Sequence, residues 1–163
     1  MHLFDRNICY SPQTTHHTEE GFAIDCFFGF SNCCISLLAR VARLAHECDT
    51  RRIDNNGDID PEWRPSQEVT KDAEQLQEEL SQSRWHVHRG CRHNRTEDEA
   101  ESEKSRLELQ EMISVNETFH LAGLIHLNRR VLGKAPNDEG IQEYVKLILQ
   151  ALEGVRKGGT AES

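Results

Sequence analysis

The sequence predicts an all-α fold, an irregular antiparallel array of about four to five helices. In several segments apolar residues recur at the three- and four-residue spacing of amphipathic helices. No segment alternates polar and apolar residues as a half-buried strand does. Only 36% of the residues are hydrophobic and 29% are charged, so we expect part of the chain to stay outside a packed core.

The first strong helix is predicted from Ser31 to Cys48. Ser31 is a suitable N-cap because its hydroxyl can accept a hydrogen bond from a free N–H of the first turn. The apolar segment 24–30 before it is broken by a glycine and is expected to pack against the helix. One face of the helix carries the apolar residues Cys34, Leu37, Leu38, Val41, Leu44, Ala45 and Cys48.

A thinner helix is predicted from Ser66 to about Trp85, after a polar loop over 49–65. The loop contains the Asn-Asn-Gly-Asp turn signal at 55–58 and two prolines, which break helices. The apolar stripe of this helix is narrow and consists of Val69, Ala73, Leu76 and Leu80. Its packing against the other helices, or its independence from them, stays open at this point.

The most apolar part of the chain is predicted to be a helix enclosed by other helices. Thr96, with Glu99 three residues later, has the pattern of a capping box and opens a charged helix that becomes apolar after Leu107. From Phe119 to Leu132 most of the circumference is apolar, which is typical of a buried helix. The residues concerned are Leu121, Ala122, Leu124, Ile125, Leu127, Val131 and Leu132.

A last helix is predicted after a short Lys-Ala-Pro-Asn turn. Asn137 is expected to cap it, while Asp138 and Glu139 lie where the helix dipole favours anions. A basic last turn and two glycines, at 158 and 159, mark its end. Its apolar stripe is formed by Ile141, Tyr144, Val145, Ile148, Ala151, Leu152 and Val155.

These elements divide the chain into three parts. We expect a flexible N-terminal tail over 1–21, one helical domain over 22–158 and a C-terminal tail over 159–163. Polar loops are expected within the domain near 49–65 and 86–96.

Charge and hydropathy exclude several classes of function. With 28 acidic and 19 basic residues the net charge is -9, so direct contact with nucleic acid is not expected, because phosphate neutralisation needs clustered Lys and Arg. No run of about 18 apolar residues exists, so no membrane partner is expected. The N-terminus lacks the basic and apolar regions of a secretory signal, and the six cysteines are therefore expected as thiols in a reducing compartment.

No catalytic, cofactor-binding or metal site is predicted, and we do not expect an enzyme. The best local metal candidate is the tract of His86, His88, Cys91 and His93, but it lacks the second ligand pair that structural zinc sites bring from another element. A solvated loop is the favoured interpretation of that tract. Cys34 is interpreted as a small core residue, and His120 and His126 as packed or surface histidines.

Two segments resemble elements of one known family. GFSNCCISLLARVARLA (29–45) is similar to the element of the fungal-specific transcription factor domain in which a glycine precedes an apolar helix. Residues 116–152 resemble a later element, a helix of the form Glu-x-Phe/Tyr-x-x-Ala-x-x-Ile/Leu-x-Leu followed by a Pro-containing turn and an amphipathic helix. The matching positions are Glu117, Phe119, Ala122, Ile125, Leu127 and Arg129.

The resemblance implies a fungal regulator of transcription in the nucleus, whose helical domain controls a zinc-cluster DNA-binding domain through protein partners or a neighbouring regulatory region. The family's binuclear cluster needs six closely spaced cysteines on a basic background. Here the cysteines are scattered over Cys9, Cys26, Cys33, Cys34, Cys48 and Cys91. We therefore predict a fragment of the regulatory domain without its own DNA-binding motif.

The alternative is a freestanding helical oligomerisation or adaptor protein with no link to transcription. In that case residues 99–132 would form one long helix that pairs with a copy of itself.

Overall fold

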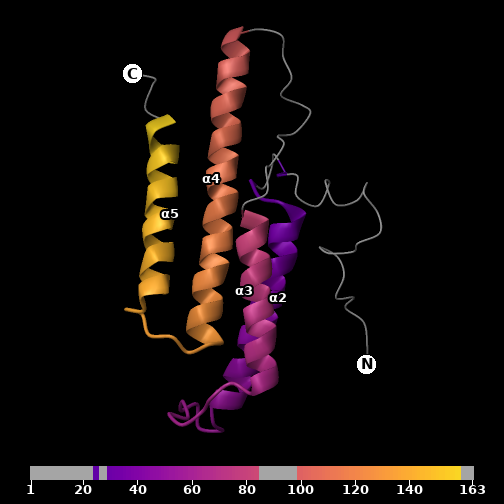
Figure 1. Cartoon of the computed structure of the whole chain (residues 1–163), viewed down its shortest axis with the longest axis vertical. Coiled ribbons are helices and arrows are strands. Elements are labelled where there is room, and N and C mark those ends of the chain that lie inside the picture. The colour runs from indigo at the N-terminus through magenta and orange to yellow at the C-terminus, as the bar shows by residue number, and fades with distance from the viewer. Residues whose placement is uncertain (1–23, 26–28, 85–98, 159–163) are drawn as a thin grey trace, which may run out of the picture.

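The structure is a computed structural model that describes residues 24–25, 29–84 and 99–158. Its helices are α2 (Asn32–Arg52), α3 (Gln67–Arg84), α4 (Glu99–Arg130) and α5 (Glu139–Gly158), and successive helices run in opposite directions (Figure 1). In these ranges only two isolated β-bridges occur and no strand forms, so the predicted all-α class is confirmed. No helix of the described ranges is long and apolar enough to cross a membrane.

Helix α4 is the centre of the array, and α2, α3 and α5 all pack against it. The predicted burial of the apolar segment after Phe119 is confirmed for one face of the helix, where Leu121, Leu124 and Leu127 have no exposed surface. It is wrong for the rest of the circumference, because Ala122 and Phe119 are exposed and Ile125 is half-buried. The core cluster consists of Cys33, Leu37, Val41, Leu44, Ala45, Cys48, Val69, Ala73, Leu76, Leu80, Leu121, Leu124, Leu127 and Val131. The open question about α3 is thereby answered: it packs against both α2 and α4.

Helix α2 begins as predicted and continues further than predicted. The Ser31 hydroxyl accepts a hydrogen bond from the Cys34 N–H at 3.1 Å, which confirms it as the N-cap. The helix runs on to Arg52, four residues beyond Cys48, and closes with a hydrogen bond from the Ile53 N–H to the Asp49 carbonyl. An ion pair from Arg52 to the Asp49 carboxylate at 2.6 Å supports this added turn.

The turn predicted at 55–58 is present in the loop between α2 and α3. Asp54 Oδ1 accepts from the backbone N–H groups of Asn56 and Asp58 at 2.9 and 2.8 Å, and Gly57 has φ 87°. Helix α3 lies within one residue of its predicted limits at each end. All four residues of its predicted stripe are buried.

The cap predicted at the start of α5 is wrong by one residue. Asp138 Oδ1, and not Asn137, accepts from the N–H groups of Gly140 and Ile141 at 3.1 and 3.2 Å. The helix begins at Glu139 because the turn that follows α4 is longer than expected: Leu132 N–H bonds back to the Leu127 carbonyl, and Gly133 takes φ 67°.

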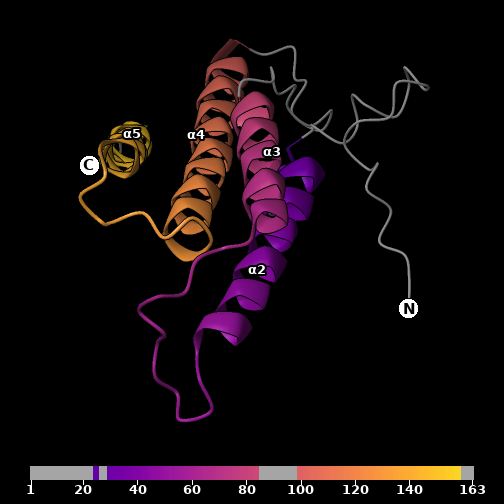
Figure 2. The same ribbon diagram turned by 60° about the horizontal axis from the view of Figure 1, so that its bottom comes forward.

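Helix α5 packs chiefly on α4 and lies apart from α2 and α3 (Figure 1). Figure 2 shows α5 end-on while α4 is seen along its length, so the two helices cross at an angle. The predicted tails, the predicted loop over 86–96, the Thr96 cap and the His86–His93 tract lie outside the described residues.

Candidate functional site

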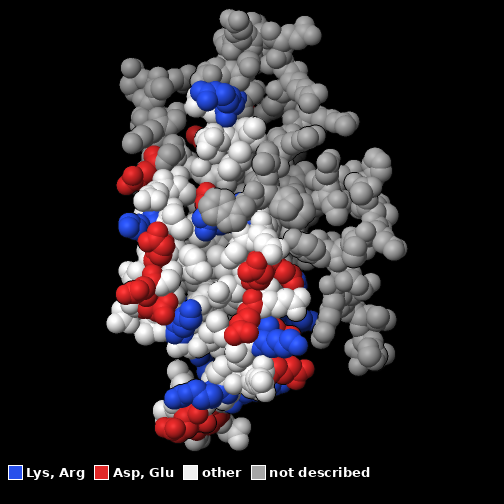
Figure 3. All heavy atoms as spheres, viewed as in Figure 1, with Lys and Arg blue, Asp and Glu red and all other residues white. Residues whose placement is uncertain are grey.

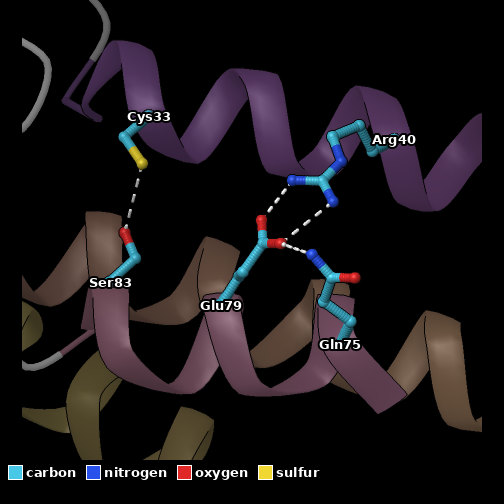
Figure 4. Close-up of polar contacts among 5 residues, drawn as sticks. All are labelled: Cys33, Arg40, Gln75, Glu79 and Ser83. Atoms are coloured by element: carbon cyan, nitrogen blue, oxygen red, sulfur yellow. Dashed lines mark hydrogen bonds and ion pairs between the residues drawn. The ribbon is translucent and has the colours of Figure 1, made fainter. Parts of the chain in front are cut away.

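A polar seam joins α2 to α3. The Arg40 guanidinium forms a two-pronged ion pair with the Glu79 carboxylate, in which Nη2 donates to Oε1 at 3.1 Å and Nη1 donates to Oε2 (Figure 4). Gln75 Nε2 donates to the same Glu79 Oε1 at 3.0 Å. Because the Arg40 side chain remains 37% exposed, water weakens this pair, and we interpret it as a tie that orients the two helices.

A buried polar cluster lies at the end of this seam and includes a histidine. His120 Nδ1 lies 2.7 Å from the Asn116 carbonyl, which can only accept, so Nδ1 carries a proton. In a neutral ring Nε2 is then the acceptor, and the Ser83 hydroxyl lies 2.9 Å from it. Ser83 Oγ also lies 3.7 Å from Cys33 Sγ (Figure 4), so one hydroxyl connects α2, α3 and α4.

The same cluster holds the beginning of α2 against α4. Asn116 Oδ1 accepts from the Ser31 N–H at 2.9 Å, so a buried backbone donor at the cap of α2 is satisfied by a side chain of α4. Sequence reasoning placed none of Asn116, His120 and Ser83 together. Their spacing was a usable signal, because Asn116 and His120 continue the buried row of Leu124, and Ser83 stands three residues after Leu80.

The thiols of Cys34 and Cys48 are buried, which disfavours their ionised form. Burial raises the pKa of the Cys34 thiol from 9.0 to about 12. Burial, reinforced by the nearby Asp49 carboxylate, also raises the pKa of Cys48 above 9.0. Cys34 has no exposed surface, which confirms its interpretation as a core residue, and His126 lies on the surface as expected.

In the part of the chain that the structure describes, no metal-binding site is formed. No group of three or more His, Cys, Asp or Glu side chains there converges as ligands. The cluster of Cys33, Ser83 and His120 is buried and joins three helices through contacts of the Ser83 hydroxyl.

Helix α5 carries the most distinctive exposed surface. Val145, Leu149 and Leu152 are 37%, 58% and 40% exposed, and their spacing of four and three residues places them in one row. We call these three residues the α5 apolar edge. The other side of the predicted stripe is covered: Ile141 is buried, and Tyr144 and Ile148 pack partly against the core. Leu147, which was not part of the predicted stripe, also packs there.

The apolar stripe predicted for α5 is thus wider than the face that α4 covers. Val145 and Leu152, which belong to that stripe, face outward, and Leu149 widens the exposed row. Lys146 and Glu153 flank the row on one side, one residue after Val145 and one after Leu152. On the face shown in Figure 3, acidic and basic side chains are interspersed, and the described residues form no patch of Lys and Arg alone.

Comparison with known proteins agrees with the resemblance found in the sequence. Residues 3–163 match the fungal specific transcription factor domain, which extends the similarity well beyond the two segments that suggested it. No curated protein and no solved structure matches the chain. The matched family is one of transcription factor domains, which supports a role of the chain in transcription regulation. The chain belongs, over almost its whole length, to the fungal specific transcription factor domain family.

Proposed function

We propose that the helical domain over 22–158 is a regulatory interaction module that acts in the nucleus through contacts with protein partners or a neighbouring regulatory region. The observation that carries this proposal is the α5 apolar edge. Contact with water is unfavourable for three aliphatic side chains in one row on the surface, and the free energy falls when a protein surface covers them.

Charge supports a regulatory role without direct contact to DNA. A DNA-reading surface collects Lys and Arg over several phosphate spacings, whereas this chain has a net charge of -9 and intersperses the two signs on the face in Figure 3. Among the exposed basic groups, Arg43 and Lys146 have a carboxylate of their own helix within 4 Å. In this proposal, therefore, another part of the regulator reads the DNA.

The alternative of a self-pairing adaptor helix has one supporting observation and one against it. Helix α4 is a single helix of 32 residues, as that alternative requires. However, its buried apolar face, with Leu121, Leu124 and Leu127, lies in the core shared with α2 and α3, and α5 packs on it as well. A copy of α4 would have to displace these helices, so we favour the regulatory module.

The proposal is tested by joining the full chain to an unrelated DNA-binding domain in a fungal reporter strain. We expect reporter expression to change relative to the DNA-binding domain alone, and Leu149→Glu to remove most of that change. Ile35→Glu is the matched control, because Ile35 is 43% exposed on α2, away from α5. Both variants should accumulate to wild-type levels in the nucleus.

Two outcomes would contradict the proposal. One is a fusion that leaves reporter expression unchanged. The other is a purified chain that binds duplex DNA with the steep salt dependence of phosphate contacts.

A further inference from the structure

We infer that the α5 apolar edge is covered by α5 of a second copy of this chain, packed antiparallel about Leu149. This inference rests on the proposed use of the edge as an interaction surface and goes further by naming its occupant.

The spacing of the α5 apolar edge matches the apolar seam of a coiled coil, and we call this edge the seam. Val145, Leu149 and Leu152 follow one another at four and then three residues, as the d, a and d positions of a heptad do. Their exposed fractions rise to a maximum at Leu149, the central residue of the row. The seam is short, so the pair is expected to be weak and to form reversibly with concentration.

The charges beside the seam favour a second copy. Lys146 and Glu153 both occupy the e position of this heptad, on the flank away from the apolar residues that pack on α4. A two-fold axis near Leu149 brings Lys146 of one copy to Glu153 of the other, and the reverse pair forms by symmetry. Within its own helix Lys146 forms an ion pair with Glu143 at 3.8 Å, which is long and exposed and leaves the ammonium able to turn.

The position of α4 selects the antiparallel direction. The other flank of the seam holds Ile141 and Ile148, which pack on α4 and the core. In a parallel pair the e position of one helix faces the g position of the other, so Lys146 would meet Ile141 or Ile148 and the α4 helix beside them. The antiparallel pair instead joins the two charged flanks to each other.

The first experiment is analytical ultracentrifugation of the full chain over a range of concentrations at low salt. We expect a reversible dimer for the wild type and for Ile35→Glu, and a monomer for Leu149→Glu at the same concentrations. Far-UV circular dichroism of all three proteins checks that the helices are retained, which is expected because both substituted side chains are exposed.

Charge reversal tests the direction and register of the pair. Lys146→Glu and Glu153→Lys should each weaken the dimer about tenfold, because each places like charges together twice in the symmetric pair. The double variant restores opposite charges and should return the dissociation constant to within about threefold of the wild type. High salt should reduce all of these differences.

The inference is overturned if the wild type stays monomeric throughout, if Leu149→Glu still dimerises, or if the double charge reversal is no better than either single change. These results are separable from the proposed function. A monomeric wild type whose reporter effect is still lost in Leu149→Glu would keep the interaction module and replace its occupant by another protein. A dimer with no reporter effect would keep the pairing and contradict the function.

Discussion

Gly123 lies where α2 packs closely against α4, and the substitution Gly123→Ala tests how close this packing is. Gly123 lies on the buried side of α4, where an added Cβ would stand 2.7 Å from Leu38 Cδ2 and 3.4 Å from Leu80 Cδ2. A separation of 2.7 Å is too short for two carbon atoms, so the Leu38 methyl must move aside. Leu38 is half-buried and can yield, whereas Leu80 has no exposed surface.

Two opposing effects set the size of the change in the free energy of unfolding. Alanine is favoured over glycine inside a helix by about 0.8–1.0 kcal/mol. Overfilling a packed interface costs about 1–3 kcal/mol. We therefore expect Gly123→Ala to lower the stability by about 1 kcal/mol. In a Leu38→Ala background the obstructing methyl is absent, and the same change should raise the stability by up to about 1 kcal/mol.

Urea unfolding followed by far-UV circular dichroism, on the wild type, the two single variants and the double variant, gives the four free energies of this cycle. The expected interaction between positions 38 and 123 is about 2 kcal/mol. A gain of about 1 kcal/mol from Gly123→Ala in both backgrounds would refute the reasoning, because it would mean that α2 does not reach Gly123. The same experiment with Gly123→Val should show a larger loss, since the added methyl groups extend toward Leu80.

Three further predictions concern the cap of α5, the buried thiol and the histidine cluster. Asp138→Ala should lower the free energy of unfolding by about 1 kcal/mol, whereas Asn137→Ala should leave it nearly unchanged, because of the two only Asp138 accepts hydrogen bonds from the first turn of α5. Thermal denaturation of the two variants and the wild type measures the difference. Burial raises the pKa of Cys34 from 9.0 to about 12, so the free energy of unfolding should be constant below pH 9 with respect to this thiol and should fall as the pH rises toward 12. In urea titrations at alkaline pH, the free energy of unfolding of Cys34→Ala should decrease less with pH than that of the wild type. His120→Leu should cost about 1–3 kcal/mol because it leaves the Ser83 hydroxyl without its ring nitrogen, and adding Ser83→Ala should recover part of that loss in urea unfolding; full additivity of the two changes would contradict the hydrogen bond.

The helices could be predicted because their signals are local. Ser31 caps α2 through a hydroxyl three residues from its donor, and the stripe of α3 repeats every three or four residues between clear breakers. The cap of α5 was misplaced because Asn137 and Asp138 are both good capping residues. Only the shape of the turn before them, with Gly133 at positive φ, decides which one meets the free N–H groups.

The candidate sites were less predictable because they depend on pairs far apart in the chain. Ser83 and His120 are 37 residues apart, and no local pattern joins them. The stripe of α5 indicated which residues are apolar, but the covered part of it depends on where α4 lies. Leu149 is the clearest case, since its exposure follows from the crossing of α5 over α4 and from nothing in its own neighbourhood.

The dependence of α5 on a single neighbouring helix has a consequence for exchange between molecules. Of its described side chains only Ile141 is fully buried, and its support comes chiefly from α4. Because few of its side chains are buried and it packs mainly on α4, we expect α5 to open as a separate cooperative unit at less free energy than the whole domain, while α2, α3 and α4 remain folded. Each opening uncovers the flank of α4, and an identical helix from a neighbouring molecule fits that flank as well as its own. Helix α5 is therefore the element through which two copies of this domain can exchange by domain swapping.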